Sequence, residues 1–464
     1  MPKLIDKYNS RHGAGGDSLH LVTNIDTSLL YDELRNKYSS LGEAVEVSFR
    51  QMVSWVTLGD QFTHHLHPYP AKLLPHIANF FIRSSVVRGK TGLVLDPFCG
   101  SGTVALEASL AGLVPLIADA NPLALLLAKV KTFPYELERL RSELRRVVSK
   151  SRRYRVAPRV EVVNAEHWYK KEHKDKLEII SRAISEIDDE NVMDFFRVAL
   201  SVVAKKVSYS DPAVSVPVRL RQKESLSVEA NKKIRERLTW IESLNVVDEF
   251  YQVCEVNIAR VAESNRHLPE RKPAVHVGND ARSLHGVDNV GRPSLILTSP
   301  PYGSAQKYIR ASSLSLNWLG LANPNELSAL EGRSIGREHL PQWQAKIEGD
   351  VELPSRYEDM LSRVHAINPL REKITRQYLQ DMHASVSEMC RVLSDGGCLV
   401  FVVGNNTVCG EILYNDEFLI DVCRNHGMKL ELSLIDHIKS RGLMTKRNQT
   451  ASVIAREAIL VFRK

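Results

Sequence analysis

The sequence predicts an α/β fold built on a Rossmann-like, mostly parallel sheet with an antiparallel terminal hairpin. Two consecutive segments, residues 91–112 and 113–130, each read as an apolar strand, a turn and a helix. Two later segments, PAVHVGNDARSL (273–284) and SLILTSPPYG (294–303), also begin with apolar residues typical of a strand. Strands that alternate with helices are typical of a parallel sheet. Two further strand-like runs close the chain and suit an antiparallel hairpin.

Length and composition limit the possible architectures and functions. The chain has 464 residues, too many for one compact core, which indicates two domains or one domain with large insertions. A net charge of +7 suits a polyanionic partner, although charge alone is a weak argument for nucleic acid. The sequence lacks both an apolar run of about 18 residues and the apolar core of a signal peptide. Its six cysteines are scattered, so we expect a cytoplasmic protein without disulfides, zinc ribbon or membrane span.

Changes in composition and in the pattern of apolar residues divide the chain into four parts. We expect an N-terminal helical extension over 1–59 and the first half of the α/β domain over 60–132. Residues 133–270 read as a mainly helical insertion with basic stretches. The second half of the α/β domain is expected over 271–464, with an irregular insertion at 320–372.

The glycine turn in LVLDPFCGSGT indicates a ligand site. Asp96 ends a buried strand, and Gly100 and Gly102 let the backbone turn sharply and let a ligand approach closely. Thr103 begins a helix whose free N–H groups point to where open α/β sheets bind ligands. The spacing matches neither a P-loop nor a full G-x-G-x-x-G, so ATP and NAD both fit poorly. The alternative is a plain tight turn between a strand and a helix.

Acidic residues also follow the next two predicted strands. Asp119 ends the second strand, where a carboxylate can accept both hydroxyls of a ribose. Asp280 ends the third strand and could accept from an adenine amino group. Either residue alone could instead cap a helix. Together with Asp96, they place three acids at three successive strand ends, which favours a ligand role.

Three motifs together resemble the amino-methyltransferases, which use S-adenosylmethionine to methylate exocyclic amines of DNA bases. They are DPFCGSGT (96–103), ADANPLA (118–124) and TSPPY (298–302). The resemblance is closest to site-specific cytosine-N4 DNA methyltransferases of restriction-modification systems, and it covers about 60–132 and 273–464. It implies a class I methyltransferase fold, S-adenosyl-L-methionine as cofactor and double-stranded DNA as substrate. A cognate restriction endonuclease is a candidate partner.

The resemblance also assigns roles to individual residues. In the family, the first motif binds the methionine part of the cofactor, and the acids after the second and third strands bind its ribose and its adenine edge. The segment HPYPAK resembles the N-terminal cofactor motif that closes over the methionine end. The residues implied here are Asp96, Phe98, Gly100, Gly102, Asp119, Asp280, His67, Pro68, Tyr69 and Lys72. Cys99 is better explained by small-residue packing in the turn.

The double proline in TSPPY suits an amine clamp. Methyl transfer to an exocyclic amine needs two acceptors aimed at its two hydrogens, because its lone pair is delocalised into the ring. Ser299 offers a hydroxyl oxygen and Pro300 a carbonyl, while Pro300 and Pro301 stiffen the loop and bring no competing N–H group. Tyr302 offers a ring face for a base flipped out of the duplex. The alternative is a strand-terminating turn with a buried tyrosine.

The acceptor base is less sharply defined. Serine at 299, where adenine-N6 members of the family usually carry aspartate, favours cytosine N4, but adenine N6 and RNA bases stay open. A Pro-Cys nucleophile is absent, so methylation of a ring carbon through a covalent adduct is not expected. Tyr308 lines either the base pocket or the core. The histidines at 64, 65, 67 and 76 are irregularly spaced without an acidic or thiol companion, so we expect no metal.

The helical insertion at 133–270 is our candidate target-recognition region, by analogy with families that place this region between the two motifs. It carries LRRVVSKSRRYR for phosphates, and Arg219, Arg221, Gln222 and Lys223 for phosphates or base edges. Such charge runs could equally be solvated helix faces. The segment 320–372 and the basic loop 437–450 compete for the same role.

Overall fold

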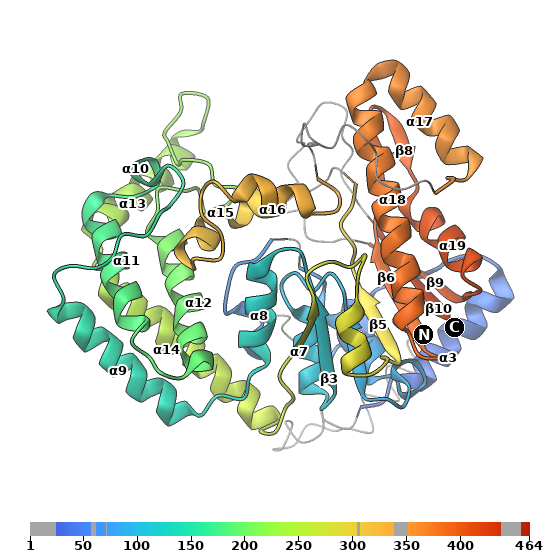
Figure 1. The fold of residues 1–464 in the computed structure, drawn as a ribbon, viewed down its shortest axis with the longest axis horizontal. Helices are drawn as coiled ribbons and strands as arrows, with labels where there is room; N and C mark the ends of the chain where they lie inside the picture. The colour runs from blue at the N-terminus through green and yellow to red at the C-terminus, as the bar shows by residue number, and fades with distance from the viewer. Residues whose placement is uncertain (1–24, 57–61, 71, 304–306, 338–350, 438–455) are drawn as a thin grey trace.

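The computed structural model describes residues 25–56, 62–70, 72–303, 307–337, 351–437 and 456–464. These residues form an eight-stranded sheet at the centre of the molecule (Figure 1). In spatial order its strands are β1 (Val45–Val47), β9 (Lys429–His437), β10 (Arg456–Arg463), β6 (Cys398–Val403), β5 (Leu295–Thr298), β2 (Leu93–Asp96), β3 (Val114–Ala118) and β4 (Val275–Gly278).

The sheet is mostly parallel, which confirms the predicted fold class. Strands β4, β3, β2, β5 and β6 pair in parallel, and β10 is antiparallel to both β6 and β9. Strands β9 and β10 are the predicted terminal hairpin. Strand β6 is buried along its whole length, as expected for a strand covered on both faces.

The strand order reverses between β2 and β5. From β2 the chain proceeds outward through β3 to β4, whereas from β5 it proceeds the other way through β6. Ligands of open α/β sheets bind beyond the carboxyl ends of the strands at such a switch point. The topology therefore directs attention to the turns that follow β2 and β5.

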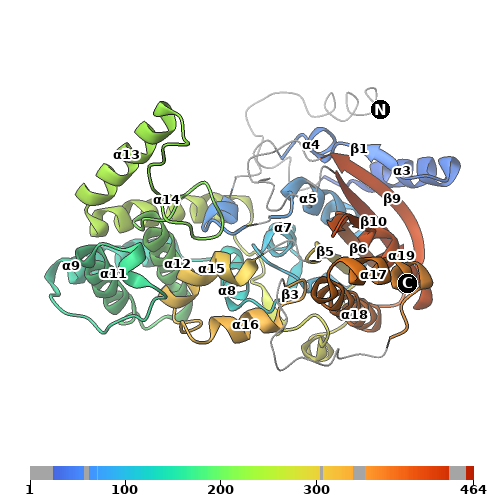
Figure 2. The same cartoon turned by 90° about the horizontal axis from the view of Figure 1, so that it is seen from above.

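Helices cover both faces of the sheet (Figure 2). Successive residues of β2 alternate between the two cores: Val94 packs with α3 (Ser28–Leu41) and α5 (Pro75–Arg83), and Leu95 packs with α18 (Pro369–Val392). This alternation follows the two-residue period of a strand. The other helices over the sheet are α4 (Phe49–Met52), α6 (Ser85–Arg88), α7 (Thr103–Leu110), α8 (Pro122–Thr132), α17 (Ser355–Ile367) and α19 (Asn415–Asn425).

A helical region flanks the β4 side of the sheet (Figure 1). It contains α9 (Leu137–Arg153), α10 (Ala165–Trp168), α11 (Lys171–Ile184), α12 (Glu190–Lys206), α13 (Val228–Ser243) and α14 (Val246–His267). Its apolar core is continuous with α8 and with α15 (Tyr308–Trp318), the helix that follows β5. The helical region therefore packs directly on α8, which begins within the ADANPLA motif, and on α15, which follows the TSPPY loop. Its role in target recognition stays a prediction.

The extension and the irregular insertion hold more regular structure than their sequences indicate. Strand β1 lies inside the extension that we expected to be helical, and it pairs with β9 at the sheet edge. The range 320–372 contains α16 (Leu327–Arg333), α17 and the start of α18. The smaller elements are the hairpin β7 (Asn406–Val408) and β8 (Glu411–Leu413), and the 3-10 turns η2 (Phe62–His65) and η3 (His285–Asn289). The polar N-terminal residues and the basic loop 438–450 lie outside the described residues.

No helix within the described ranges has the length and apolar character needed to cross a bilayer.

Candidate active site

The glycine turn after β2 is shaped by close packing of α7 on α8. Gly102 caps α7 with φ of 73°, and a Cβ there would lie 2.9 Å from the Cα of Ala128. Gly100 also has a positive φ, 45°, and a Cβ on it would face the Tyr69 ring at 3.6 Å. Only glycine meets both demands at position 102 without strain. The turn therefore brings the backbone close to α8 and to the HPYP segment.

Asp96 is buried at the end of β2 and accepts two hydrogen bonds. Its Oδ1 accepts from the N–H of Phe98 at 3.1 Å and from the hydroxyl of Thr298 at 2.7 Å. Burial raises the pKa of Asp96 to about 7, although both hydrogen bonds act in the opposite direction. Asp96 thus organises the turn and connects it to the end of β5.

Asp119 lies directly after β3 and holds the glycine turn from the other side. Its Oδ2 accepts from the N–H of Gly100 and its Oδ1 from the N–H of Asn121, both at 2.8 Å. Burial raises its pKa to about 6 despite these bonds. Each carboxylate oxygen can accept a second hydrogen bond, so the residue keeps capacity for two hydroxyls.

The HPYP segment lies against the turn and against α15. Asn121 donates to the hydroxyl of Tyr69 and to that of Ser312, each at 3.2 Å. His67 is buried with Nε2 3.4 Å from the Ser315 hydroxyl, whereas its Nδ1 has no partner. Burial, reinforced by nearby lysines, lowers the pKa of His67 to about 3, so the ring is neutral. Pro68 and Lys72 are exposed.

Two buried groups that the sequence did not single out fasten this segment. Lys131 of α8 donates to the carbonyls of His64, at 2.9 Å, and Ser101, at 2.6 Å, and so joins the turn η2, just before the HPYP segment, to the glycine turn. Glu107 of α7 lies 2.7 Å from Nε2 of His64. From the sequence alone, a lysine near the end of an apolar helix would be expected to extend its charged group into solvent. The structure shows that Lys131 points inward instead.

Helix α14, in the helical region, holds the turn η2 that precedes the HPYP segment. Arg260 donates to the carbonyl of His65 at 2.7 Å, and the N–H of Phe62 donates to Glu263 at 3.2 Å. The ring of Phe62 also packs against His267, with centroids 5.1 Å apart. Residues 62–65 are therefore clamped between α7, α8 and α14.

The loop TSPPY leaves β5 beside the glycine turn. Pro300 is buried, and Ser299, Pro301 and Tyr302 are partly exposed. The Tyr302 hydroxyl donates to Oε1 of Glu457, on β10, at 3.1 Å. Burial is the main cause of a strongly raised pKa of Tyr302, and Glu457 adds to it.

Behind the loop lies a polar support that sequence reasoning missed. The Tyr378 hydroxyl lies 3.1 Å from the carbonyl of Pro301 and 3.1 Å from Oδ1 of Asn415. Asn406 donates to the carbonyl of Gly303 at 2.9 Å, and Asn415 donates to Oδ1 of Asn406 at 2.8 Å. These residues come from α18, β7 and α19, far along the chain, and no local motif marks them. They tie down the carbonyls on the far side of the double proline.

Tyr308, the first residue of α15, lies near both halves of the site. Its charge is a secondary cause, after burial, of the raised pKa of three other tyrosines, Tyr69, Tyr302 and Tyr378. These three come from the HPYP segment, the TSPPY loop and its support. Tyr308 is therefore close enough to interact electrostatically with all three, and its role toward a base stays a prediction.

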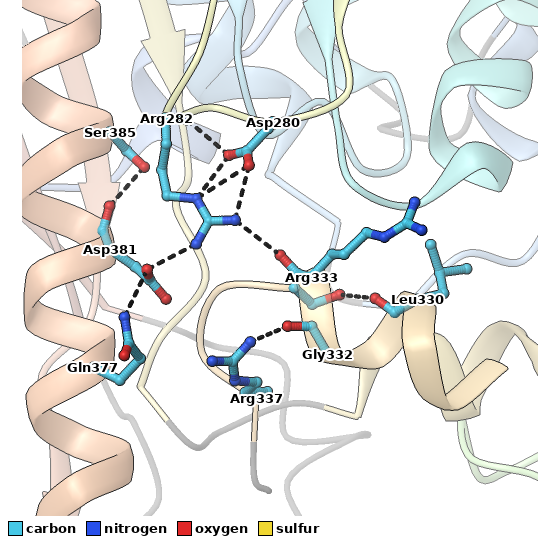
Figure 3. A network of polar contacts seen from close by, with 10 residues as sticks. Asp280, Arg282, Leu330, Gly332, Arg333, Arg337, Gln377, Asp381 and Ser385 are labelled. Carbon is cyan, nitrogen blue, oxygen red and sulfur yellow. Dashed lines mark hydrogen bonds and ion pairs between the residues drawn. The ribbon is translucent and has the colours of Figure 1, made fainter. Parts of the chain in front are cut away.

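Asp280 lies two residues beyond β4 and is engaged by Arg282 (Figure 3). The Arg282 guanidinium contacts both carboxylate oxygens of Asp280 at 2.8–3.1 Å and also Asp381 of α18 at 2.8 Å. The backbone N–H of Arg282 donates to Asp280 as well. The carboxylate is therefore shared with an ion-pair network that the sequence did not indicate. Its predicted role toward adenine requires a ligand to bind beside that network.

The predicted DNA-contacting residues of the helical region lie apart from the two loops (Figure 1). They occupy the segment between α12 and α13. Arg219 donates to the carbonyl of His167 and stacks on the Tyr209 ring at 4.6 Å. Arg221 and Lys223 have exposed side chains. The structure thus gives Arg219 a packing role and leaves Arg221 and Lys223 on the surface.

The described residues contain no group of three or more His, Cys, Asp or Glu side chains arranged to hold a metal ion.

Comparisons with known proteins agree on one class. Residues 64–155, from η2 through α9, match the family described as UPF0020, RMKL-like, methyltransferase domain. The chain is 25% identical over 422 residues to the type II methyltransferase M.MvaI of Kocuria varians, covering 85% of this chain and 88% of that protein. It is 29% identical over 91 residues to the type II methyltransferase M.MjaII of Methanocaldococcus jannaschii, covering 20% and 17%. No solved structure matches the chain at a significant level.

The fold and these likenesses together support a methyltransferase.

Proposed function

We propose that this protein transfers a methyl group from S-adenosylmethionine to an exocyclic amine of a DNA base, with cytosine N4 as the acceptor. One observation carries the proposal: the glycine turn and the TSPPY loop follow two hydrogen-bonded parallel neighbours, β2 and β5. The 2.7 Å bond from Thr298 to Asp96 joins the two strand ends. A donor held at one end and an amine held at the other would share the same edge of the sheet.

The residues around the glycine turn fit the proposed cofactor. Gly100 and Gly102 leave no side chain in the turn, and the first N–H groups of α7 have no acceptor within the helix. Asp119 keeps acceptor capacity for the hydroxyls of a ribose, and the unpartnered Nδ1 of His67 is available to a ligand. When bound, the cofactor supplies a sulfonium methyl group whose carbon–sulfur bonding pair stays on sulfur.

The TSPPY loop suits the acceptor amine. Ser299 and the Pro300 carbonyl can each accept one amine hydrogen, which draws the nitrogen toward a tetrahedral arrangement and frees its lone pair. Tyr302 can stack on a base that has left the duplex. The preference for cytosine N4 rests on serine at position 299 and on the family resemblance of the motifs.

DNA as the substrate is supported by the resemblance and by the relatives, both named type II methyltransferases. The net charge of +7 is compatible with a polyanionic substrate. We assign sequence recognition to the helical region 133–270, with Arg221 and Lys223 as exposed candidates for phosphate contacts. A restriction-modification system, with a cognate nuclease, is the corresponding biological setting.

The test is direct identification of the product. Purified protein is incubated with labelled S-adenosylmethionine and either plasmid DNA or tRNA, and the nucleic acid is digested to nucleosides. We expect labelled N4-methyldeoxycytidine from DNA, and none from the Ser299→Ala variant if its folding and cofactor binding match the wild type. N6-methyladenine from DNA, or label only in RNA, would replace the proposed acceptor by one of the alternatives that use the same loop.

A further inference from the structure

The side chain of Arg282 joins three parts of the chain beyond the end of β4 (Figure 3). Its Nε and Nη2 donate to the two carboxylate oxygens of Asp280, the proposed acceptor for the adenine of the cofactor. Its Nη1 donates to Oδ1 of Asp381, on α18, at 2.8 Å. Its Nη2 also lies 3.5 Å from the carbonyl of Arg333, the last residue of α16. Because a guanidinium holds its donors in one rigid plane, these partners are fixed relative to one another.

The bonds from Arg282 leave Asp280 with one place for a ligand. Its Oδ1 accepts from the backbone N–H and from Nε of Arg282, both at 2.9 Å, which uses both lone pairs. Its Oδ2 accepts from Nη2 at 2.8 Å, and the single proton of Nε makes only a longer contact with it, at 3.1 Å. Oδ2 can therefore accept one further hydrogen bond. The side chain of Asp280 is 39% exposed, so a donor can reach it.

Asp381 shares one turn of α18 with a support of the TSPPY loop. Tyr378 donates to the carbonyl of Pro301 at 3.1 Å, and Asp381 follows it by three residues, the spacing of neighbours on a helix surface. Both side chains are buried. Gln377 donates to Oδ1 of Asp381 at 3.1 Å and helps to hold this carboxylate. A shift of this helical turn relative to Arg282 would therefore also move the Tyr378 hydroxyl.

The segment that follows α16 supports the same loop. Gly336 approaches the loop so closely that a Cβ on it would lie 3.1 Å from the Tyr302 carbonyl oxygen and 3.4 Å from Cβ of Pro301. This glycine is only three residues beyond Arg333, whose carbonyl faces Arg282. The contact with the guanidinium and the contact with the loop thus lie at the two ends of one short turn.

We propose that Arg282 is a positioning residue for both substrates. It orients the remaining lone pair of Asp280 toward the adenine amino group of the cofactor, and it holds the two supports of the TSPPY loop in place for the acceptor base. The inference rests on the proposed function and adds that one side chain aligns both halves of the site. Lysine cannot do the same, because an ammonium group lacks the planar fork that binds one carboxylate through two donors and another through a third.

A second arginine provides a matched control. Arg391 of α18 binds Glu388 of its own helix at 2.7–2.9 Å and Asp288 of η3 at 3.2 Å. It therefore also ties α18 to the region that follows β4. It lies about 15 Å further along the helix than Asp381, at 1.5 Å per residue, and so further from the turn that carries Tyr378. Arg391→Lys thus weakens a similar bridge between the same elements away from both proposed substrates.

The cofactor half is measured by calorimetry without DNA, with S-adenosylhomocysteine as the probe. Arg282→Lys should weaken its binding by about tenfold, whereas Asp381→Leu should leave the affinity unchanged because Arg282 still holds Asp280. S-inosylhomocysteine carries a carbonyl in place of the adenine amino group. It should bind the wild type at least about tenfold more weakly, because it has no hydrogen to give to Asp280. Equal affinities for the two probes would overturn the proposed contact with adenine.

The acceptor half is measured as single-turnover methyl transfer to plasmid DNA at saturating cofactor, with the full-length protein. Arg282→Lys and Asp381→Leu should each slow transfer by about tenfold to a hundredfold, because a small displacement of the loop misaligns the reacting atoms. Arg391→Lys should keep the wild-type rate and cofactor affinity. A wild-type rate in Asp381→Leu, or an equal loss in Arg391→Lys, would overturn the proposal.

A double variant separates positioning from stability. Arg282→Met leaves the buried carboxylate of Asp381 without its guanidinium partner, which should lower the midpoint of urea unfolding. Addition of Asp381→Leu removes that charge, so the midpoint should return toward the wild-type value while transfer stays slow. Recovery of transfer together with stability would show that Arg282 only stabilises the fold. Absence of transfer by the wild type to any base would instead refute the proposed function.

Discussion

The hydroxyl of Thr298 donates to the buried carboxylate of Asp96 at 2.7 Å, and each of these residues ends a strand of the switch point. The bond crosses from the strand before the glycine turn to the strand before the TSPPY loop. It therefore adds a side-chain link between the two loops to the backbone pairing of these short strands. The proposed transfer requires the cofactor and the acceptor base to meet, so it depends on the relative position of these two loops.

Removal of this bond should destabilise the protein in a pH-dependent way. Thr298→Val keeps the shape of the side chain but leaves Asp96 with one donor fewer, and we expect a loss of about 1–3 kcal/mol. The loss should be larger at pH 8 than at pH 5, because a bond to an ionised acceptor is stronger. Denaturant unfolding at the two pH values measures both, with Thr298→Ser as the control that keeps the hydroxyl. Equal losses at both pH values would contradict an ionisable acceptor.

The raised pKa of Asp96, about 7, makes a prediction of its own. In the unfolded chain an aspartate has a pKa of about 3.9, so between these values the folded state alone keeps the proton. The contribution of Asp96 to stability is therefore full below about pH 4, falls as pH rises, and is constant above about pH 7.

Asp96→Asn removes this component. Relative to the variant, the wild type should lose on the order of 3 kcal/mol of unfolding free energy between pH 4 and pH 8. Urea unfolding of both proteins across this range measures the difference. A difference that stays constant with pH would show that the carboxyl group is already ionised in the folded protein at pH 4.

Gly102 should be intolerant of a side chain because of packing as well as conformation. Gly102→Ala places a methyl group 2.9 Å from the backbone of Ala128 at a φ of 73°. Gly427 has nearly the same φ, 74°, with open space around it, so Gly427→Ala measures the conformational cost alone, about 1 kcal/mol. We expect Gly102→Ala to cost at least about 2 kcal/mol more in thermal or denaturant unfolding. Equal costs would mean that α7 and α8 separate easily.

Asp119 should control cofactor affinity. Asp119→Ala removes the proposed ribose acceptor and also the partner of the Gly100 N–H. We expect at least about a tenfold weaker binding of S-adenosylmethionine by calorimetry, with a smaller effect for Asp119→Asn, which keeps one acceptor oxygen. Unchanged affinity in a folded Asp119→Ala variant would remove the residue from the proposed site.

The sequence was sufficient to predict the placement of those parts of the candidate site that are contiguous in the chain. The glycine turn and the TSPPY loop could be predicted because a few adjacent residues dictate a backbone shape, and parallel strands carry such turns to one edge. Asp119 could be predicted for the same reason, because it directly follows a strand that ends at the same edge of the sheet. These residues need no knowledge of what packs around them.

The supports of the site could not be predicted, because they arrive from distant elements. Tyr378 and Asn415 reach the double proline from α18 and α19, and Glu457 reaches Tyr302 from β10. Each is a single polar residue in an otherwise regular element. Its partner is defined only by the fold. For Asp280 the sequence predicted a carboxylate open to a ligand, but Arg282, only two residues away, binds that carboxylate.

The attachment of residues 62–65 to α14 limits how this protein can be rebuilt. Because Arg260 and Glu263 hold the backbone of His65 and Phe62, the helical region is attached to the segment that precedes the glycine turn. A chimaera that exchanges this region for that of a relative would have to import the matching stretch between β1 and β2 as well. Without that stretch, the exchanged region would leave the turn beside the glycine loop without its contacts to α14.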